Sequence, residues 1–130
     1  MEHESLTRQI IGGAMRVHST LGPGFLESVY HHALAWELRT AGRAVDSEQR
    51  LVVRYRDAVV GEFAADLLVE ASVLVEVKAV RAVAPAHEAQ VVNYLTATGL
   101  HVGLLLNFGA PSLQFRRLTR TAERGHLAAH

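Results

Sequence analysis

The sequence predicts an α/β fold of the α+β type, in which helices pack on a mixed sheet. The chain has 130 residues, of which 49% are hydrophobic and 20% are charged, so one domain with its own core fits. Helical spacing of apolar residues gives way to short runs rich in Val, Tyr and Phe, and then returns. No repeat or linker divides the chain. We therefore predict one domain over residues 1–120, followed by a frayed tail at 121–130.

Two helices are predicted first. From Leu6, apolar residues recur every three or four positions, and this pattern stops at Leu21-Gly22-Pro23-Gly24. A second helical pattern runs from about Phe25 to Ala41, with Gly42 placed to cap its carboxyl end.

The middle of the chain reads as strands. Residues 44–80 predict three strands in an antiparallel meander, with turns at Arg56-Asp57-Ala58 and Glu70-Ala71-Ser72. Pro85 then suits the first turn of a helix over 86–98 that ends at Gly99. Two more strands follow, an almost purely apolar one covered on both faces and a weaker one after Pro111, at 102–107 and 113–118.

Composition excludes several classes of protein. The absence of cysteine rules out a disulfide scaffold, a zinc ribbon, an iron–sulfur cluster and thiol catalysis, and it agrees with a cytoplasmic protein. Charged residues interrupt every long apolar stretch, so we expect no membrane or export segment. Thirteen basic residues balance thirteen acidic ones, which argues against coating nucleic acid by bulk charge. A positive excess gathers near the C-terminus, at Arg116, Arg117, Arg120 and Arg124.

Three charged residues fall in predicted strands. Glu76 and Lys78, the only lysine, project from one face of their strand, and Asp66 lies in the preceding strand. A three-residue turn would place Asp66 opposite Glu76, whereas a two-residue turn would oppose it to Val77. Paired carboxylates repel unless a cation such as Mg²⁺ lies between them. An ordinary cross-strand salt-bridge cluster on a solvated face is an equally weighted interpretation.

Two further groups favour a functional site. Glu27 begins the second helix directly after the Gly-Pro-Gly turn, although a carboxylate there also suits the helix dipole. His87, Gln90 and Tyr94 are spaced to share one face of the third helix, although polar helix faces are common.

Several of these motifs resemble a known family. Gly24-Phe25-Leu26-Glu27-Ser28-Val29-Tyr30 is similar to the signature of the GxxExxY family, small bacterial and archaeal proteins of the PD-(D/E)XK nuclease superfamily. The resemblance runs from about Leu6 to Leu118. It includes, in order, Val17-His18, Ala65-Asp66-Leu67-Leu68-Val69, Val75-Glu76-Val77-Lys78-Ala79, His87-Glu88-Ala89-Gln90, Asn93-Tyr94-Leu95 and Leu106-Asn107-Phe108-Gly109.

This resemblance implies a restriction-endonuclease-like core and a set of site residues. The chain also resembles the RecB-like branch, which uses a helix glutamate, a strand aspartate, an acid-x-lysine pair and a Gln-x-x-x-Tyr motif. The implied catalytic residues are Glu27, Asp66, Glu76 and Lys78. The implied substrate-binding residues are Gln90 and Tyr94, with His87 beside them. The implied metal ligands are Asp66, Glu76, Glu27 and the backbone carbonyl of Val77, with Mg²⁺ as cofactor and Mn²⁺ as its substitute.

The leading hypothesis is therefore a magnesium-dependent nuclease that hydrolyses phosphodiester bonds, with DNA expected ahead of RNA as its partner. In that mechanism the metal activates a water molecule, and Lys78 positions the water or stabilises charge in the transition state. The alternative is a catalytically silent nuclease-fold module that acts in nucleic-acid binding or homo-oligomeric assembly. We also expect a homo-oligomer, in which the C-terminal arginines of two chains complete a basic channel.

Overall fold

A computed structural model describes residues 3–120 of the chain, and its order of helices and strands is the predicted one. The predicted tail at 121–130 lies outside the described residues. The elements are α1 (Glu4–Leu21), α2 (Glu27–Thr40), β1 (Val45–Tyr55), β2 (Ala58–Val69), β3 (Val73–Lys78), α3 (Pro85–Thr98), β4 (Val102–Asn107) and β5 (Gln114–Thr119).

The strands form one mixed sheet in the order β1-β2-β3-β4-β5. The predicted meander of β1, β2 and β3 is confirmed, because both of its pairs are antiparallel. The chain then crosses through α3 before it returns to the sheet, and β4 consequently runs parallel to β3. β5 pairs antiparallel to β4 and forms the edge of the sheet opposite β1.

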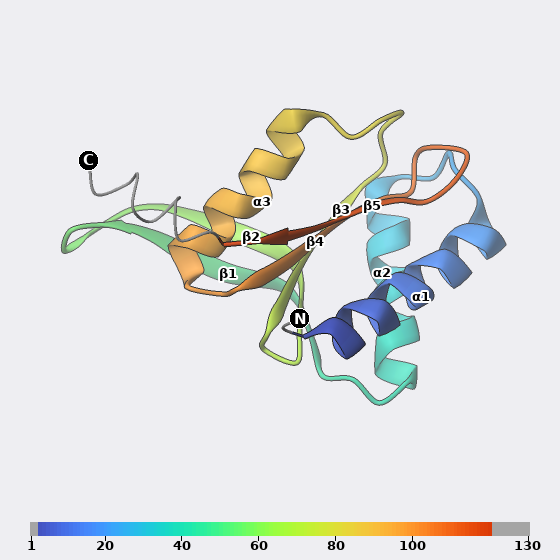
Figure 1. Cartoon of the computed structure of the whole chain (residues 1–130), viewed down its shortest axis with the longest axis horizontal. Coiled ribbons are helices and arrows are strands. Elements are labelled where there is room, and N and C mark those ends of the chain that lie inside the picture. The colour runs from blue at the N-terminus through green and yellow to red at the C-terminus, as the bar shows by residue number, and fades with distance from the viewer. Residues whose placement is uncertain (1–2, 121–130) are drawn as a thin grey trace.

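Helices cover both faces of the sheet. Figure 1 shows α1 and α2 together on one side and α3 on the other. The larger core lies under α1 and α2, and the smaller one lies under α3. β4 is buried along its whole length, as predicted from its apolar sequence. None of the helices in residues 3–120 is long and apolar enough to cross a membrane.

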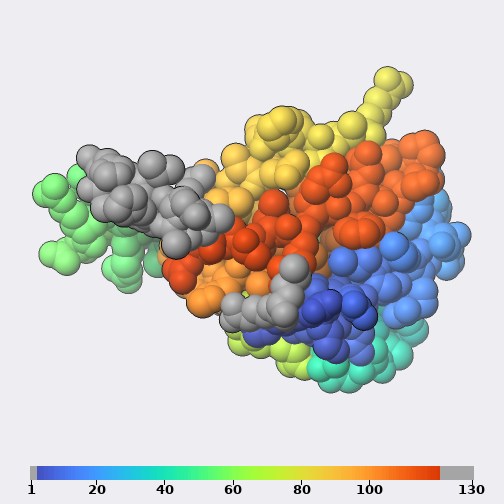
Figure 2. All heavy atoms as spheres, viewed as in Figure 1, coloured from blue at the N-terminus to red at the C-terminus, as the bar shows by residue number. Residues whose placement is uncertain are grey.

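The turn between β2 and β3 decides which residues face each other. Val69 pairs with Val73, so the turn has three residues, and Glu70 and Ala71 adopt positive φ angles of 52° and 51°. The other predicted turn is one residue shorter than expected, because Ala58 already pairs with Tyr55. Arg56 makes this two-residue connection possible with a φ of 56°. Figure 2 shows the far end of this hairpin (green) projecting from the body of the protein.

A buried tyrosine fixes the start of α2. The Tyr30 hydroxyl donates a hydrogen bond to the Gly22 carbonyl and accepts one from the backbone N–H of Phe25 at 3.1 Å. Its ring stacks on Phe108 with the centroids 4.8 Å apart. Leu26 remains extended before the helix, so α2 begins at Glu27 and not at Phe25 as the periodicity suggested. The Gly-Pro-Gly turn therefore holds Glu27 at a defined place over the sheet.

Candidate active site

The candidate site lies where β2 and β3 separate. Their ladder pairs Val69 with Val73, Leu68 with Leu74 and Leu67 with Val75, and it ends there. At the next position along the two strands, hydrogen bonds between backbone and side chain replace the backbone–backbone bonds of the ladder. The backbone N–H of Val77 donates to Asp66 Oδ2 at 2.7 Å, and the backbone N–H of Asp66 donates to Glu76 Oε1 at 3.4 Å. We call this place, with Asp66 and Glu76, the fork.

The fork brings together a buried carboxyl group, Glu76, and a partly exposed one, Asp66. Glu76 is 6% exposed. Burial first, and the charge of Asp66 second, raise the pKa of Glu76 from its ordinary value of 4.5 to about 8. The backbone hydrogen bond from Asp66 and the charge of Lys78 act in the opposite direction. Without a cation, the fork therefore binds a proton at neutral pH.

Glu27 and Lys78 lie within electrostatic reach of the fork. Burial raises the pKa of Glu27, and the negative charge of Asp66 raises it further. Lys78 lowers the same pKa, as do His31 and His87 to a smaller extent. Lys78 stands at the end of β3, two residues beyond Glu76. One ammonium group thus counters two of the predicted acids, Glu27 and Glu76.

Gln90 and Tyr94 form a pair on α3 at the edge of the same site. Gln90 Nε2 donates to the Tyr94 hydroxyl at 2.8 Å. The Tyr94 ring stacks on Phe63 of β2, with the centroids 3.8 Å apart. Burial raises the pKa of the Tyr94 hydroxyl, and the charges of Glu76 and Asp66 raise it further. The hydroxyl therefore remains a neutral hydrogen-bonding group, and it lies within electrostatic reach of both carboxylates.

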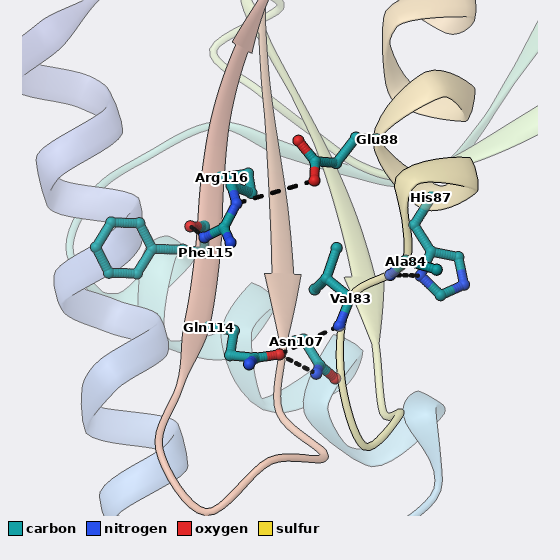
Figure 3. Close-up of polar contacts among 8 residues, drawn as sticks. All are labelled: Val83, Ala84, His87, Glu88, Asn107, Gln114, Phe115 and Arg116. Carbon is teal, nitrogen blue, oxygen red and sulfur yellow. Dashed lines mark hydrogen bonds and ion pairs between the residues drawn. The ribbon is translucent and has the colours of Figure 1, made fainter.

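His87 has a structural task besides its predicted contact with substrate. Its Nδ1 accepts a hydrogen bond from the backbone N–H of Ala84 at 3.0 Å, at the start of α3 (Figure 3). The backbone N–H of His87 in turn donates to the Ala84 carbonyl at 2.9 Å. Because Nδ1 already accepts the hydrogen bond from Ala84, only Nε2 of the His87 ring is available to contact a substrate.

A buried asparagine that sequence reasoning did not assign to the site holds the loop after Lys78. The Asn107 side chain accepts from the Val80 N–H at 2.9 Å and donates to the Val80 carbonyl at 2.9 Å. It also donates to Gln114 Oε1 at 2.9 Å, and that oxygen accepts from the Val83 N–H at 3.3 Å (Figure 3). The available signal in the sequence was a polar residue at the end of an otherwise apolar strand, and the structure shows that this residue is fully buried.

The structure places beside Asp66 a histidine that the sequence did not assign to the site. His31 Nδ1 lies 3.8 Å from Asp66 Oδ1. His31 follows Glu27 by one helical turn, and this spacing was the signal that could have placed both residues over the same strand. Within residues 3–120, the group whose ligand atoms all lie within 4.8 Å of one another is His31, His32 and Glu48. That group contains none of the predicted metal ligands.

The fork fits a hard divalent cation by the chemistry of its donors. Asp66 and Glu76 supply carboxylate oxygens, and Glu27 and the Val77 carbonyl offer further oxygen donors nearby. Mg²⁺ and Mn²⁺ prefer such oxygen ligands. The raised pKa of Glu76 reflects its burial first and the neighbouring negative charge of Asp66 second, and a bound cation would counter both effects.

Comparison with known proteins supports the fold and identifies the superfamily. A family model described as the PD-(D/E)XK nuclease superfamily matches residues 4–118. No curated protein matches the sequence. Among solved structures, the crystal structure of SSO0001 is similar with a TM-score of 0.59 at 16% identity, a level that shows the fold alone. The match covers 98% of this chain and 64% of SSO0001. Since the family model spans nearly all of the described residues, the chain belongs to the PD-(D/E)XK nuclease superfamily.

Proposed function

We propose that this chain is a magnesium-dependent nuclease of the GxxExxY type that hydrolyses phosphodiester bonds of nucleic acid. Membership in the superfamily suggests nuclease-type chemistry. The observation that carries the proposal is the fork, where the Asp66 and Glu76 side chains meet at the end of a ladder and Lys78 counters the charge of Glu76.

The proposed metal ligands are Asp66, Glu76, Glu27 and the backbone carbonyl of Val77. When bound, Mg²⁺ would polarise the scissile phosphate and lower the pKa of an attacking water. Glu76 must lose its proton to act as a ligand, so cation binding at the fork should release a proton near neutral pH.

The proposed role of Lys78 is to stabilise negative charge that develops on the phosphate, or to orient the attacking water. An ammonium is a compact point charge that fits beside two acids. Glu27 and Glu76 both interact with it electrostatically, which supports its place at the reacting groups. The Asn107 contacts hold the loop that follows Lys78, so they help to fix the direction of the lysine.

Gln90, Tyr94 and His87 are proposed to bind the substrate. The Gln90 side chain and the Tyr94 hydroxyl offer hydrogen bonds to phosphate oxygens beside the fork. Arg116 lies on the edge strand β5, where it is exposed and 3.9 Å from Glu88 of α3 (Figure 3). Arginines at this edge would contact the phosphate backbone, and we propose DNA ahead of RNA as the substrate and a homo-oligomer as the assembly.

The test is cleavage of labelled single- and double-stranded DNA and RNA in the presence of Mg²⁺, Mn²⁺ or a chelator. We expect cleavage with either metal and none with chelator. Asp66→Asn should remove it, whereas Glu62→Gln, an exposed acid on β2, should leave it unchanged. A chain that binds Mg²⁺ at the fork but cuts none of the substrates would contradict the proposal and favour the silent module.

A further inference from the structure

A second cluster of metal-ligating side chains lies beside the fork. His31 and His32 are neighbours on α2, and their ring centroids are 5.2 Å apart. Glu48 approaches them from β1, and one ligand atom from each of the three residues lies within 4.8 Å of the others. The β1–β2 ladder omits the Glu48 position, where the backbone has a φ of 52°.

His31 independently points to a ligand. Its side chain is buried, with 5% of the residue exposed. Nδ1 lies 3.8 Å from Asp66 Oδ1, and Nε2 is buried without a hydrogen-bond partner among the described residues. An unpaired buried ring nitrogen is unfavourable, because burial removes the water that would otherwise bond to it. The ring therefore keeps one nitrogen available for a cation.

We propose that His31, His32 and Glu48 bind a Zn²⁺ ion. Zinc commonly binds two imidazole nitrogens together with one carboxylate oxygen. In a tetrahedral site these three ligands leave a fourth position open to water. Magnesium prefers oxygen ligands alone, so the two clusters differ in the metal that they select.

Zinc at this cluster would connect α2 to the edge of the sheet. The ligands come from a helix and from β1, two elements that Arg39 of α2 also joins by hydrogen bonds to the Val45 carbonyl at 2.8 Å and to Ser47 Oγ at 3.3 Å. The ring nitrogen of a histidine ligand that does not bind the metal commonly interacts with a carboxylate. For His31 that carboxylate would be Asp66, whose Oδ1 lies 3.8 Å from Nδ1. The inference goes beyond nuclease activity and does not require the fork to bind Mg²⁺.

The test is a zinc titration of the full, metal-stripped chain in competition with a chromophoric chelator. We expect one tightly bound Zn²⁺ per chain. His32→Gln and Glu48→Gln should each weaken zinc binding at least tenfold, because each removes one ligand. Both residues are exposed, so these variants should unfold at the same temperature as the unchanged chain when metal is absent.

Two matched controls separate this site from other places that could hold zinc. His101→Gln removes an exposed histidine just before β4, and Glu76→Gln alters the fork. Both variants should keep the zinc affinity of the unchanged chain. The proposal is overturned if His32→Gln and Glu48→Gln bind zinc as tightly as the unchanged chain, or if the unchanged chain binds none. It is also overturned if Glu76→Gln loses zinc while His32→Gln retains it, because zinc would then occupy the fork. None of these outcomes depends on cleavage, so the zinc proposal can hold or fail independently of the nuclease assay.

Discussion

Replacing Glu76 by Gln should stabilise the metal-free protein at pH 8 and have little effect at pH 4. Gln keeps the shape of the side chain and an oxygen that can accept from the Asp66 N–H, which bonds Glu76 at 3.4 Å. It removes the charge that burial and Asp66 disfavour. Its amide can also donate to the Asp66 carboxylate, which a Glu76 carboxylate cannot do.

The magnitude follows from the raised pKa of Glu76. The folded chain holds this proton up to pH about 8, whereas the unfolded chain loses it near the ordinary value of 4.5. Between these values the folded state binds more protons, so its free energy of unfolding falls as pH rises. The full difference would be roughly 5 kcal/mol, an upper limit. Water entering the fork reduces it, and we expect about 2 kcal/mol in favour of Glu76→Gln at pH 8.

The assay is urea unfolding followed by circular dichroism at several pH values between 4 and 8, with chelator present. Glu62→Gln is the matched control, since its carboxylate is exposed on β2 and should give a nearly constant small difference. An advantage of Glu76→Gln that does not grow with pH, or a loss of stability at pH 8, would refute the reasoning. It would favour a stabilising salt-bridge cluster at these residues instead.

Four other changes test the site and its supports. Lys78→Arg should keep the fold but reduce the initial rate of cleavage about a hundredfold, because the planar guanidinium displaces groups around the reacting phosphate; an unchanged rate would exclude Lys78 from the chemistry. Magnesium at about ten times its Kd should stabilise the unchanged chain by about 1.4 kcal/mol in thermal unfolding, and equal stabilisation of Asp66→Asn would place the ion elsewhere. Gly109→Ala should cost about 3 kcal/mol in urea unfolding, because its Cβ would lie 2.4 Å from the Val80 carbonyl oxygen, whereas Gly61→Ala meets nothing within 4 Å and should change stability by less than about 0.5 kcal/mol. Tyr30→Phe should cost about 1 to 2 kcal/mol by the same measurement, since it leaves the Gly22 carbonyl without its hydroxyl donor.

The order of the elements could be predicted because each has a local cause. The α1 and α3 helices end at glycines, and β4 is apolar up to its last residue because helices cover both sides of the sheet. The facing of Asp66 and Glu76 was less certain, since a change of one residue in the turn would have moved Asp66 opposite Val77. Local sequence allowed both turns, and the pairing of Val69 with Val73 resolves the choice.

The supporting contacts could not be predicted, because they depend on how distant segments dock. Asn107 reaches back 27 residues to Val80, and His31 meets Asp66 across 35 positions of the chain. Neither spacing follows a helical or strand period. The Glu48 irregularity was equally hidden, since a charged residue in an edge strand normally continues the alternation of the strand.

Asp66 connects the two clusters, because its two carboxylate oxygens face different partners. Oδ2 accepts the Val77 N–H at the fork, and Oδ1 faces the ring of His31. A substitution at Asp66 therefore disturbs both clusters, so the result for Asp66→Asn is interpreted together with those for Glu76→Gln and His32→Gln. Glu76 belongs to the fork alone and His32 to the histidine cluster alone, so these two positions separate the contributions. The same geometry ties the two functions that we propose, since whatever holds His31 in place also constrains the carboxylate on which the fork depends.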